Sequence, residues 1–387
     1  MQKIVLLTNI LSPYRKAFYQ AMYEQGKAYD IDFRVLLMND TESDRQWKYE
    51  EYCGDYSMLL KKKVLFGKAD SLYINTDLKE KLDQLKPDML VLSGSYTFLP
   101  VWQALRWSKK NRNCRLLFWS ESHLDEMRDY HRIKYMIRDM VRKTFYSRME
   151  GFWHPGQKAK DLIQKYAKKD AFYIQVPNLI ENQMFQELAE QCAGRAADIR
   201  NTYHLSTDKT LFFAPMRLSK VKGILPFLEM IDGLPIEYKQ KVQFAIAGEG
   251  ELQDEIGQYI DEHHLEVGLL GYRSNTEVGE LMCASDVVFL SSLSDPNPLT
   301  CIEALWCKKP LYVSRHVGNA PEVIKTGENG YVFAYEDQAD ALQKLESLID
   351  ADAGWYEKAA EVSETIANEQ FDVVKNTDRI LKTLTEL

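Results

Sequence analysis

The sequence has few cysteines and no arrangement of side chains typical of a metal site. Its six cysteines include no Cys-x-x-Cys pair and no zinc spacing, and most of them lie in apolar segments. This pattern indicates buried thiols in a reducing compartment rather than a disulfide framework. Because Asp, Glu and His do not form a cage pattern either, we expect neither a metal ion nor a cofactor.

Long apolar runs are also missing. No stretch approaches the roughly eighteen apolar residues of a membrane span. The apolar start of the chain is shorter than the h-region of a signal peptide and is typical of a first buried strand. The net charge of −8 argues against nucleic acid as a partner, because that binding depends on neutralising phosphates. We therefore expect a cytoplasmic protein, able to act as a peripheral protein at the inner face of a membrane.

The rest of the sequence is typical of a globular α/β protein. Short apolar runs alternate with amphipathic stretches, which indicates parallel sheets covered by helices on both faces. Six strands are predicted in the first half, at 4–8, 33–38, 89–93, 116–120, 152–154 and 173–176. Six more are predicted in the second half, at 211–214, 243–247, 267–270, 287–290, 311–313 and 331–333.

Polar, helix-forming sequence separates the two series of strands. With 387 residues, two domains are expected. We predict two doubly wound, Rossmann-like α/β domains at 1–195 and 196–367, facing a central cleft. A final helix at 368–387 can pack on either domain, and we assign it to the first. In such sheets, ligands bind beyond the carboxyl ends of the strands.

Cations and glycines follow the first two strands of the second series. Arg217 leaves one strand end, and Lys222 and Gly223 stand where the next helix begins; together the two cations suit adjacent phosphates. Gly248 belongs to a glycine turn after the next strand, where the backbone can approach a ligand closely. Each motif is weak alone: the alternatives are a solvated loop with two surface charges and a tight turn that needs glycine for other reasons.

The loop after 287–290 carries a stronger signal. Pro298 fits the first position of a helix, whose free N–H groups at Leu299 and Thr300 can face an anion. Glu303 lies about one turn further in, where its carboxylate can accept hydrogen bonds from ribose hydroxyls. Asp295 precedes the helix and can approach a sugar ring. The alternatives are a turn residue for Asp295 and a surface helix residue for Glu303.

Taken in order, these elements resemble the donor-binding domain of retaining glycosyltransferases with the GT-B architecture, glycosyltransferase family 4. The family's Gly-Arg-Leu-x3-Lys-Gly element is similar to residues 216–223. Its Glu-x7-Glu element matches the spacing of Asp295 and Glu303. Its Gly-Gly-x-Pro-Glu element is similar to residues 318–322, and its Gly-x-x-Gly segment to residues 327–330.

The resemblance implies a role for each matched residue. Arg217 and Lys222 would hold the diphosphate and Glu303 the ribose. Asp295 would lie near the transferred sugar as the catalytic carboxylate, with hydroxyl positioning as its expected role. The base pocket would be lined by Gly271, Tyr272 and Arg273. The chain departs from the family where Asp replaces Glu at 295 and where Asn297 and Pro298 replace an aromatic or small residue and a glycine, which predicts a changed sugar or a weakened activity.

The first half resembles the family more loosely, and its candidates follow strand ends. Asn9, Ser12 and Arg15 lie in the loop after the first strand and would face the acceptor or the diphosphate. Ser95 follows another strand, and Glu322 joins this set from the second half. The alternatives are a surface charge for Arg15, a plain turn for Ser95 and an acid favoured by a helix dipole for Glu322.

Two further features of the first half are open. Either Glu121 or His123 would take the place of the family's histidine near the donor sugar. Residues 128–148 mix basic and apolar side chains, which on an acidic protein predicts an amphipathic helix at an anionic membrane surface. The alternative is an ordinary half-buried helix with a solvated basic face.

We therefore predict a retaining, hexosyltransferase-like enzyme that moves a sugar from a nucleotide-sugar, such as a UDP-sugar, to a glycan or lipid-linked saccharide. Its expected setting is surface polysaccharide or glycoconjugate synthesis, and cations would replace a metal at the leaving diphosphate. One alternative is a non-catalytic partner subunit that keeps the fold, motivated by the departures at 295 and 298. Another is a nucleotide-sugar epimerase or hydrolase that activates water with Glu121 and His123.

Overall fold

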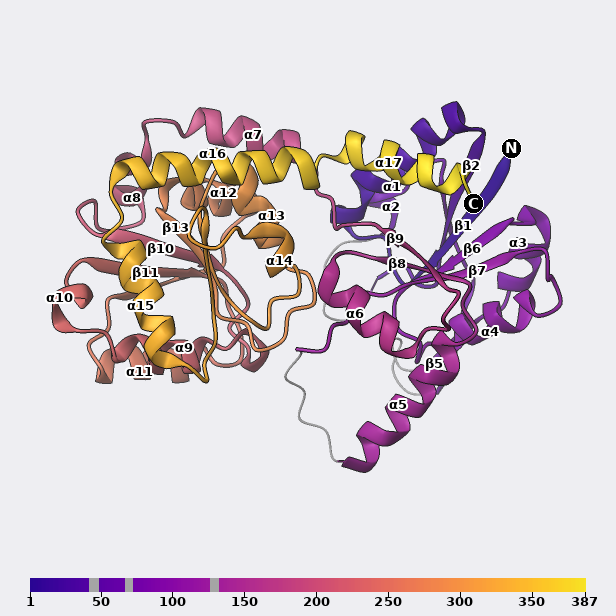
Figure 1. The fold of residues 1–387 in the computed structure, drawn as a ribbon, viewed down its shortest axis with the longest axis horizontal. Coiled ribbons are helices and arrows are strands. Elements are labelled where there is room, and N and C mark those ends of the chain that lie inside the picture. The colour runs from indigo at the N-terminus through magenta and orange to yellow at the C-terminus, as the bar shows by residue number, and fades with distance from the viewer. Residues whose placement is uncertain (42–48, 67–71, 126–131) are drawn as a thin grey trace. The chain divides into compact units, whose positions relative to one another are not determined.

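The computed structural model describes residues 1–41, 49–66, 72–125 and 132–387, which form two compact units (Figure 1). Within those ranges, the first unit comprises the chain up to Ser122, residues 132–180 and residues 372–387. The second unit comprises residues 123–125 and 181–371. Among the described helices, none is long and apolar enough to cross a membrane.

A seven-stranded parallel sheet forms the centre of the first unit, in the order β3-β2-β1-β6-β7-β8-β9. Its strands are β1 (Gln2–Thr8), β2 (Ile31–Leu37), β3 (Ser57–Leu59), β6 (Met89–Leu92), β7 (Arg115–Trp119), β8 (Gly151–His154) and β9 (Phe172–Gln175). All four residues of β6 are buried, as expected for a parallel strand with helices on both faces. Beside this sheet, β4 (Lys62–Phe66) and β5 (Leu72–Asn75) form a separate antiparallel hairpin.

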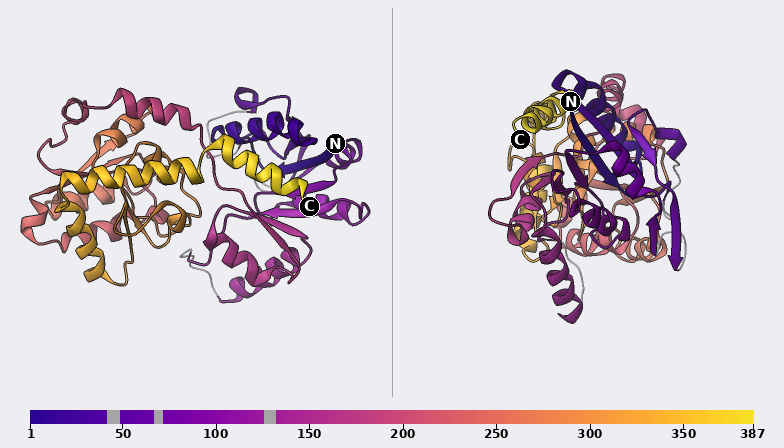
Figure 2. Two further views of the ribbon diagram at one scale, coloured as in Figure 1. Left: turned by 45° about the horizontal axis from the view of Figure 1, so that its top comes forward. Right: turned by 90° about the vertical axis from the view of Figure 1, so that its right-hand side faces the viewer.

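The helices of the first unit come from both ends of the chain. They are α1 (Pro13–Gly26), the 3-10 turn η1 (Lys27–Tyr29), α2 (Tyr49–Tyr52), α3 (Leu78–Leu85), α4 (Leu99–Ser108), α5 (Arg132–Tyr146), α6 (Gln157–Tyr166) and α17 (Val373–Thr385). The last helix, α17, packs beside α1 (Figure 2). The Tyr29 hydroxyl donates a hydrogen bond to Asp378 of α17. After the second unit, the chain thus returns to the first.

The second unit contains a six-stranded parallel sheet in the order β12-β11-β10-β13-β14-β15. Its strands are β10 (Thr210–Pro215), β11 (Val242–Ala247), β12 (Val267–Gly271), β13 (Val287–Leu290), β14 (Leu311–Ser314) and β15 (Gly330–Phe333). The rings of Phe227 and Phe289 stack at 4.7 Å, and Phe244 lies edge-on to both. This aromatic cluster fills one face of the sheet.

Helices connect these strands and extend the unit at its start and end. They are α7 (Asn182–Gln191), α8 (Ala196–Thr202), the 3-10 turn η2 (Lys220–Lys222), α9 (Ile224–Asp232), α10 (Ile236–Lys239), α11 (Gln253–Glu262), α12 (Asn275–Ala284), α13 (Leu299–Trp306), α14 (Ala320–Val323), α15 (Gln338–Ile349) and α16 (Ala353–Gln370). The chain passes between the units after Ile180, not at 195 as predicted. The reason is that α7 packs on α12 and α13 of the second unit.

The predicted fold class, two doubly wound α/β domains, is confirmed. All twelve predicted strands exist, with ends that differ by one or two residues. The strands that the sequence did not predict are β3, β4 and β5. They lie at the edge of a sheet or in the separate hairpin, where side chains need not alternate or be buried.

Candidate functional site

The predicted donor loops begin at the carboxyl ends of the strands of the second sheet, which together form one edge of that sheet. Strands β11, β10, β13 and β14 are consecutive neighbours and all run in the same direction, so their carboxyl ends lie side by side. The loop with Arg217 and Lys222 leaves β10, and the loop with Asp295 leaves the adjacent strand, β13. Segments more than seventy residues apart therefore meet at this edge.

Lys222 and Asp295 form an ion pair. The Nζ of Lys222 donates to Oδ2 of Asp295 over 2.5 Å, and the two side chains are only 26% and 13% exposed. The motifs predict separate roles for these residues, Lys222 at the diphosphate and Asp295 at the sugar, and they do not predict the contact. Because the pair is half-buried, water screens the attraction between the two side chains less than it would at an exposed surface.

Hydrogen bonds fix the backbone of these two loops against each other. The hydroxyl of Ser291 donates to the carbonyl oxygen of Lys222 over 2.7 Å. The hydroxyl of Tyr335, from beyond β15, donates to the carbonyl oxygens of Gly223 and Ser291 at 3.2 and 2.5 Å. Burial raises the pKa of Tyr335, so this hydroxyl remains a donor. Neither Ser291 nor Tyr335 was predicted, since no local motif marks a support that comes from a distant segment.

Glycines at this edge are required by contacts within the chain. Gly223 has φ of +64°, and an added Cβ would lie 2.3 Å from the carbonyl oxygen of Ser291. Gly248 has φ of +148°, and its Cβ would lie 2.0 Å from the carbonyl oxygen of Met216. The backbone that approaches Gly248 is therefore that of the loop after β10. The structure favours the alternative reading of this glycine turn, in which packing rather than a ligand requires it.

Arg217 is the most accessible of the predicted phosphate ligands. Its side chain is 64% exposed, and its Nε lies 3.9 Å from a carboxylate oxygen of Glu251, itself 55% exposed. Such an exposed pair contributes little to stability and leaves the guanidinium able to reorient. Arg217 can therefore turn toward an anion at this edge at little energetic cost.

The predicted base-pocket residues follow β12, further along the same edge. The backbone of Gly271 has a positive φ of +68°, and the side chain of Tyr272 is 71% exposed. Arg273 instead packs against its own unit: its guanidinium lies 5.4 Å from the ring centre of Tyr203 and 4.0 Å from Glu277. Tyr272 is thus the side chain most available to stack on a base.

Helix α13 begins one residue later than predicted. Pro298 is its N-cap, with φ of −65° and ψ of 128°, and Leu299 is the first helical residue. The carbonyl oxygen of Pro298 accepts a hydrogen bond from the buried side-chain amide of Asn319 over 3.0 Å. The N–H groups of Leu299 and half-buried Thr300 lie in the first turn, where helix dipoles favour anions.

Glu303 lies one turn into α13, as predicted, and is half-buried. Burial raises the pKa of Glu303 to about 7, which is far above the ordinary value for a glutamate. It is therefore not the exposed surface residue of the alternative reading. Glu322 lies in the first turn of the short helix α14 and is also half-buried.

Asp295 is held by its backbone as well as by Lys222. Its carbonyl oxygen accepts from the N–H of Gly318 over 2.9 Å, and the residue forms a parallel bridge with Val317. A Cβ added to Gly318 would lie 1.7 Å from the carbonyl oxygen of Pro296. The glycine in the predicted Gly-x-Pro-Glu element therefore keeps the loops after β13 and β14 together.

In the first unit, Arg15 and Glu121 form an ion pair. The guanidinium of Arg15 donates to the carboxylate of Glu121 and lies 4.0 Å from the ring centre of Trp119. The Arg15 side chain is only 17% exposed, so it is not the solvated surface charge of the alternative reading.

The other first-unit candidates lie close to the same edge of their own sheet. The carbonyl oxygen of Asn9 accepts from the N–H of Asn39 over 2.8 Å. Ser12 is the N-cap of α1, and no side-chain capping bond is formed there. The hydroxyl of Ser95 pairs with that of Thr97 at 2.7 Å. These contacts fit turn and cap residues, and they leave the acceptor role a prediction.

His123 belongs to the second unit, whereas Glu121 belongs to the first. His123 is buried, and its imidazole lies 3.0 Å from the position of a Cβ built on Gly318. Nearby, Nδ1 of His316 contacts the carbonyl oxygen of Asp125 at 2.5 Å. Of the two residues that the sequence left open, His123 is thus the one that lies by the loop of Asp295.

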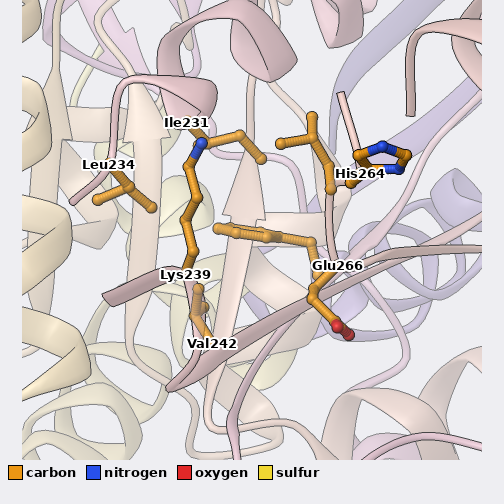
Figure 3. Close-up of a pocket in the computed structure, with 8 residues that line it drawn as sticks. Ile231, Leu234, Lys239, Val242, His264 and Glu266 are labelled. Atoms are coloured by element: carbon orange, nitrogen blue, oxygen red, sulfur yellow. The ribbon is translucent and has the colours of Figure 1, made fainter. Parts of the chain in front are cut away.

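A separate pocket lies at the opposite edge of the second sheet, where β11 and β12 begin (Figure 3). It is lined by Ile231, Leu234, Lys239, Val242, Phe244, His264, Leu265 and Glu266. The Glu266 carboxylate points away from it, and lies 3.3 Å from the amine of Lys209. This pocket is not part of the predicted donor site, which lies at the carboxyl edge.

Comparisons with known proteins identify the second unit. Residues 196–368 match the family model of glycosyl transferases group 1. The N-acetyl-alpha-D-glucosaminyl L-malate synthase of Bacillus anthracis is 28% identical over 156 residues, which cover 39% of this chain and 40% of that protein. A Campylobacter jejuni alpha-1,4-N-acetyl-D-galactosaminyltransferase, which acts on an undecaprenol-linked saccharide, is 26% identical over 133 residues, or 34% and 36% of the two chains. The chain thus spans less than half the length of these relatives.

Solved structures match the whole chain. Anabaena HepE in complex with UDP superposes with a TM-score of 0.70 at 17% identity, covering all of both chains. WaaG, a glycosyltransferase of lipopolysaccharide biosynthesis, superposes with a TM-score of 0.66 at 13% identity, covering 99% of each chain. Residues 196–368 thus match the glycosyl transferases group 1 model, and the whole chain has the GT-B fold of these glycosyltransferases.

Proposed function

We propose that this chain transfers a sugar, with retention of anomeric configuration, from a nucleoside-diphosphate sugar to a saccharide or lipid-linked acceptor. One observation carries the proposal. Arg217, the Lys222–Asp295 pair and the first turn of α13 all lie at one sheet edge, in the domain that matches glycosyl transferases group 1. Two cations and a helix N-terminus suit a diphosphate, and an adjacent carboxylate suits sugar hydroxyls.

The charges at this edge fit the chemistry of sugar transfer. As the bond between sugar and phosphate breaks, negative charge grows on the leaving diphosphate and positive charge grows on the ring. Lys222, Arg217 and the N–H of Leu299 would stabilise the diphosphate, each contributing on the order of a few kcal/mol on the precedent of preorganised donors. Asp295 would hold the sugar hydroxyls, and His123 would lie beside the reacting carbon.

The donor we favour is a UDP-sugar, recognised by its ribose and base at the same edge. Glu303 would accept hydrogen bonds from the two ribose hydroxyls, and Tyr272 would stack on the base. HepE was solved with UDP and with UDP-glucose, and a pneumococcal O-GlcNAc transferase of similar fold was solved with UDP and GlcNAc. These neighbours support the uridine nucleotide without fixing the sugar.

For the acceptor, we favour a growing saccharide carried on a lipid, in surface polysaccharide or glycoconjugate synthesis. The Campylobacter relative is named for an undecaprenol-linked acceptor. In this chain, helix α5 exposes Met136, Ile137 and Met140 by 70%, 55% and 64%, with Lys143 exposed one turn further. Apolar side chains beside a cation favour contact with an anionic membrane surface.

A donor assay tests the proposed reaction. Calorimetry with UDP- and GDP-sugars, followed by detection of released sugar and nucleotide, should show donor binding and slow hydrolysis without acceptor. Arg217→Ala and Glu303→Ala should each abolish donor turnover while the protein stays folded. Full activity in either variant would contradict the assignment.

The same assay separates the two alternatives. Donor binding without any turnover, in the presence of a range of saccharide acceptors, would identify a non-catalytic subunit. Release of an epimerised free sugar would identify a hydrolysing epimerase. A transferred sugar with the anomeric configuration of the donor, observed by NMR, would establish retention.

A further inference from the structure

The hairpin β4–β5 of the first unit carries apolar side chains that this unit does not cover. In β4, Val64, Leu65 and Phe66 are 39%, 47% and 80% exposed, and Leu72 of β5 is 42% exposed. The hairpin shares no ladder with the seven-stranded sheet. Single exposed apolar residues are common on proteins, but a contiguous group of four marks a contact surface.

The exposed residues cover both faces of the end of β4. Successive side chains of a strand point to opposite faces, so a strand that packs on one side exposes only every second residue. Here three consecutive side chains are exposed, while Tyr73 in β5, the partner of Val64, is buried. The pairing shifts between Val64 and Phe66, so the regular alternation of side chains between the two faces is interrupted at this end of the hairpin.

The base of the hairpin, in contrast, is firmly attached. The N–H of Lys61 donates to Asp77 over 2.8 Å, and the N–H of Asn75 donates to the side chain of Gln103 on α4 over 3.0 Å. The ring of Tyr73 packs near that of Phe98, with centres 6.4 Å apart. A rigid base and an uncovered apolar end are what a membrane-inserting element needs, because little order is then lost on binding.

Charge selects the kind of partner. Residues 60–75 contain four lysines and one aspartate, and residues 132–148 contain six basic residues and one aspartate. Since the whole chain carries −8, the remainder carries −16. Lys61 and Lys63 are exposed directly beside the apolar group. An anionic lipid surface complements both features of the described hairpin, since its phosphates suit Lys61 and Lys63 and its acyl boundary suits the apolar side chains beside them.

We propose that Val64, Leu65, Phe66 and Leu72 insert into the acyl boundary of an anionic membrane, with Lys61 and Lys63 at the level of the lipid phosphates. The inference rests on the proposed function only in one respect: a lipid-linked acceptor gives membrane contact its use. The hairpin would act together with α5, which packs on the same helix, α4, through Phe145 and Trp102 at 5.5 Å.

Vesicle sedimentation tests the hairpin directly. The full chain should sediment with vesicles of phosphatidylcholine and phosphatidylglycerol, and only weakly with phosphatidylcholine alone. Leu65→Ser with Phe66→Ser should lower the partition coefficient at least tenfold, on the scale of apolar insertion. Lys61→Gln with Lys63→Gln should lower the partition coefficient several-fold per lysine. Added salt should likewise lower the partition coefficient of the wild type.

Matched controls come from the second unit. Ile236→Ser removes an apolar side chain that is 71% exposed, and Lys325→Gln with Lys358→Gln removes two exposed lysines. Both control variants should bind vesicles like the wild type. Because the vesicles hold neither donor nor acceptor, the result is independent of sugar transfer, and UDP calorimetry on the same variants reports the proposed function separately.

The depth to which residue 66 inserts into the bilayer provides a second readout. In a Phe66→Trp variant, lipids brominated in the acyl chains should quench more fluorescence than in the wild type. Equal binding by the Leu65→Ser, Phe66→Ser variant, absence of wild-type binding, or equal binding to neutral vesicles would each overturn the proposal. So would a concentration-dependent dimer, seen by light scattering, that the serine variant abolishes without any loss of vesicle binding.

Discussion

At the residue scale, the Lys222–Asp295 pair links the two predicted tasks of the donor site. The cation that would bind a diphosphate is here paired with the acid that would bind the sugar, 2.5 Å away. Each side chain therefore occupies the other until a ligand that carries both a diphosphate and a sugar competes for them. The pair also explains how Asp, one methylene shorter than Glu, can fit at 295: its carboxylate reaches the amine directly.

This pair predicts opposite effects of two substitutions on UDP affinity. Asp295→Asn should tighten UDP binding, by about 1 kcal/mol for a partly buried pair, because it frees the amine of Lys222. Lys222→Met should weaken it by at least as much. Titration calorimetry measures both, and the double variant completes the cycle. If Lys222→Met binds UDP as tightly as the wild type, Lys222 does not bind the diphosphate; if Asp295→Asn weakens UDP binding, Asp295 positions the amine instead of competing for it.

Glu303 predicts a pH dependence of stability. Its pKa rises to about 7 on folding, so the folded state binds its proton more tightly than the unfolded state does. This group's contribution to the free energy of unfolding is fully present at pH below the ordinary glutamate range and is lost as pH rises toward 7. Glu303→Gln should therefore raise the melting temperature relative to wild type more at pH 8 than at pH 5. Thermal denaturation at both values measures this, and an equal difference would show that Glu303 is not desolvated.

Glu303 should also couple UDP binding to proton release. Ribose hydroxyls that donate to its carboxylate favour the ionised form, so UDP should lower the pKa and release a proton near pH 6.5. Calorimetry in two buffers with different ionisation enthalpies counts that proton. The Glu303→Gln variant is the control, and proton release that persists in it would belong to another group.

At the element scale, the loops at the carboxyl ends of the second sheet depend for their packing on glycines that contact this chain's own backbone. Gly318→Ala should lower the melting temperature by several degrees and abolish UDP binding, because its methyl group would overlap the carbonyl oxygen of Pro296. Gly257→Ala is the matched control: it lies within α11 with no atom near its added methyl, so it should stabilise the protein by about 0.5–1 kcal/mol. A harmless Gly318→Ala would show that the loops can separate freely.

The same elements show what the sequence could and could not predict. The buried strands were predictable because parallel strands under two helical layers are continuous apolar runs, as in β6 and β13. The order of the donor motifs along the chain correctly predicted that their loops lie at the carboxyl ends of the strands of the second sheet. The hairpin β4–β5 was not predicted, because a strand such as Lys62–Phe66 with exposed side chains has no period to detect.

Supports that cross the fold were not predictable either. The hydroxyl of Tyr335 holds the carbonyl oxygens of Gly223 and Ser291, and the amide of Asn319 holds that of Pro298. These contacts join segments that only the sheet order brings together. The ion pair of Arg15 with Glu121 belongs to the same class.

At the scale of the whole molecule, the two units should respond separately to ligand and to mutation. Leu381 and Leu384 of α17 are fully buried in the first unit. Leu381→Ala should cost about 2–5 kcal/mol in that unit. In scanning calorimetry, UDP should raise the melting temperature of the second unit only, and Leu381→Ala should lower the melting temperature of the first unit only. Val374→Ala, at a residue that is 64% exposed, is the control; a single transition that shifts with both changes would show that the units unfold together.

The return of the chain to its first unit has a consequence for biosynthesis. Residues 181–371 are complete on the ribosome before α17 is made, whereas the first unit, although begun earlier, must wait for its last helix. Until then the surface of α1 that α17 covers is open to chaperones and proteases. The unit that starts first thus matures after the other, and a premature stop codon just after Phe371 would leave a complete second unit and a first unit without α17.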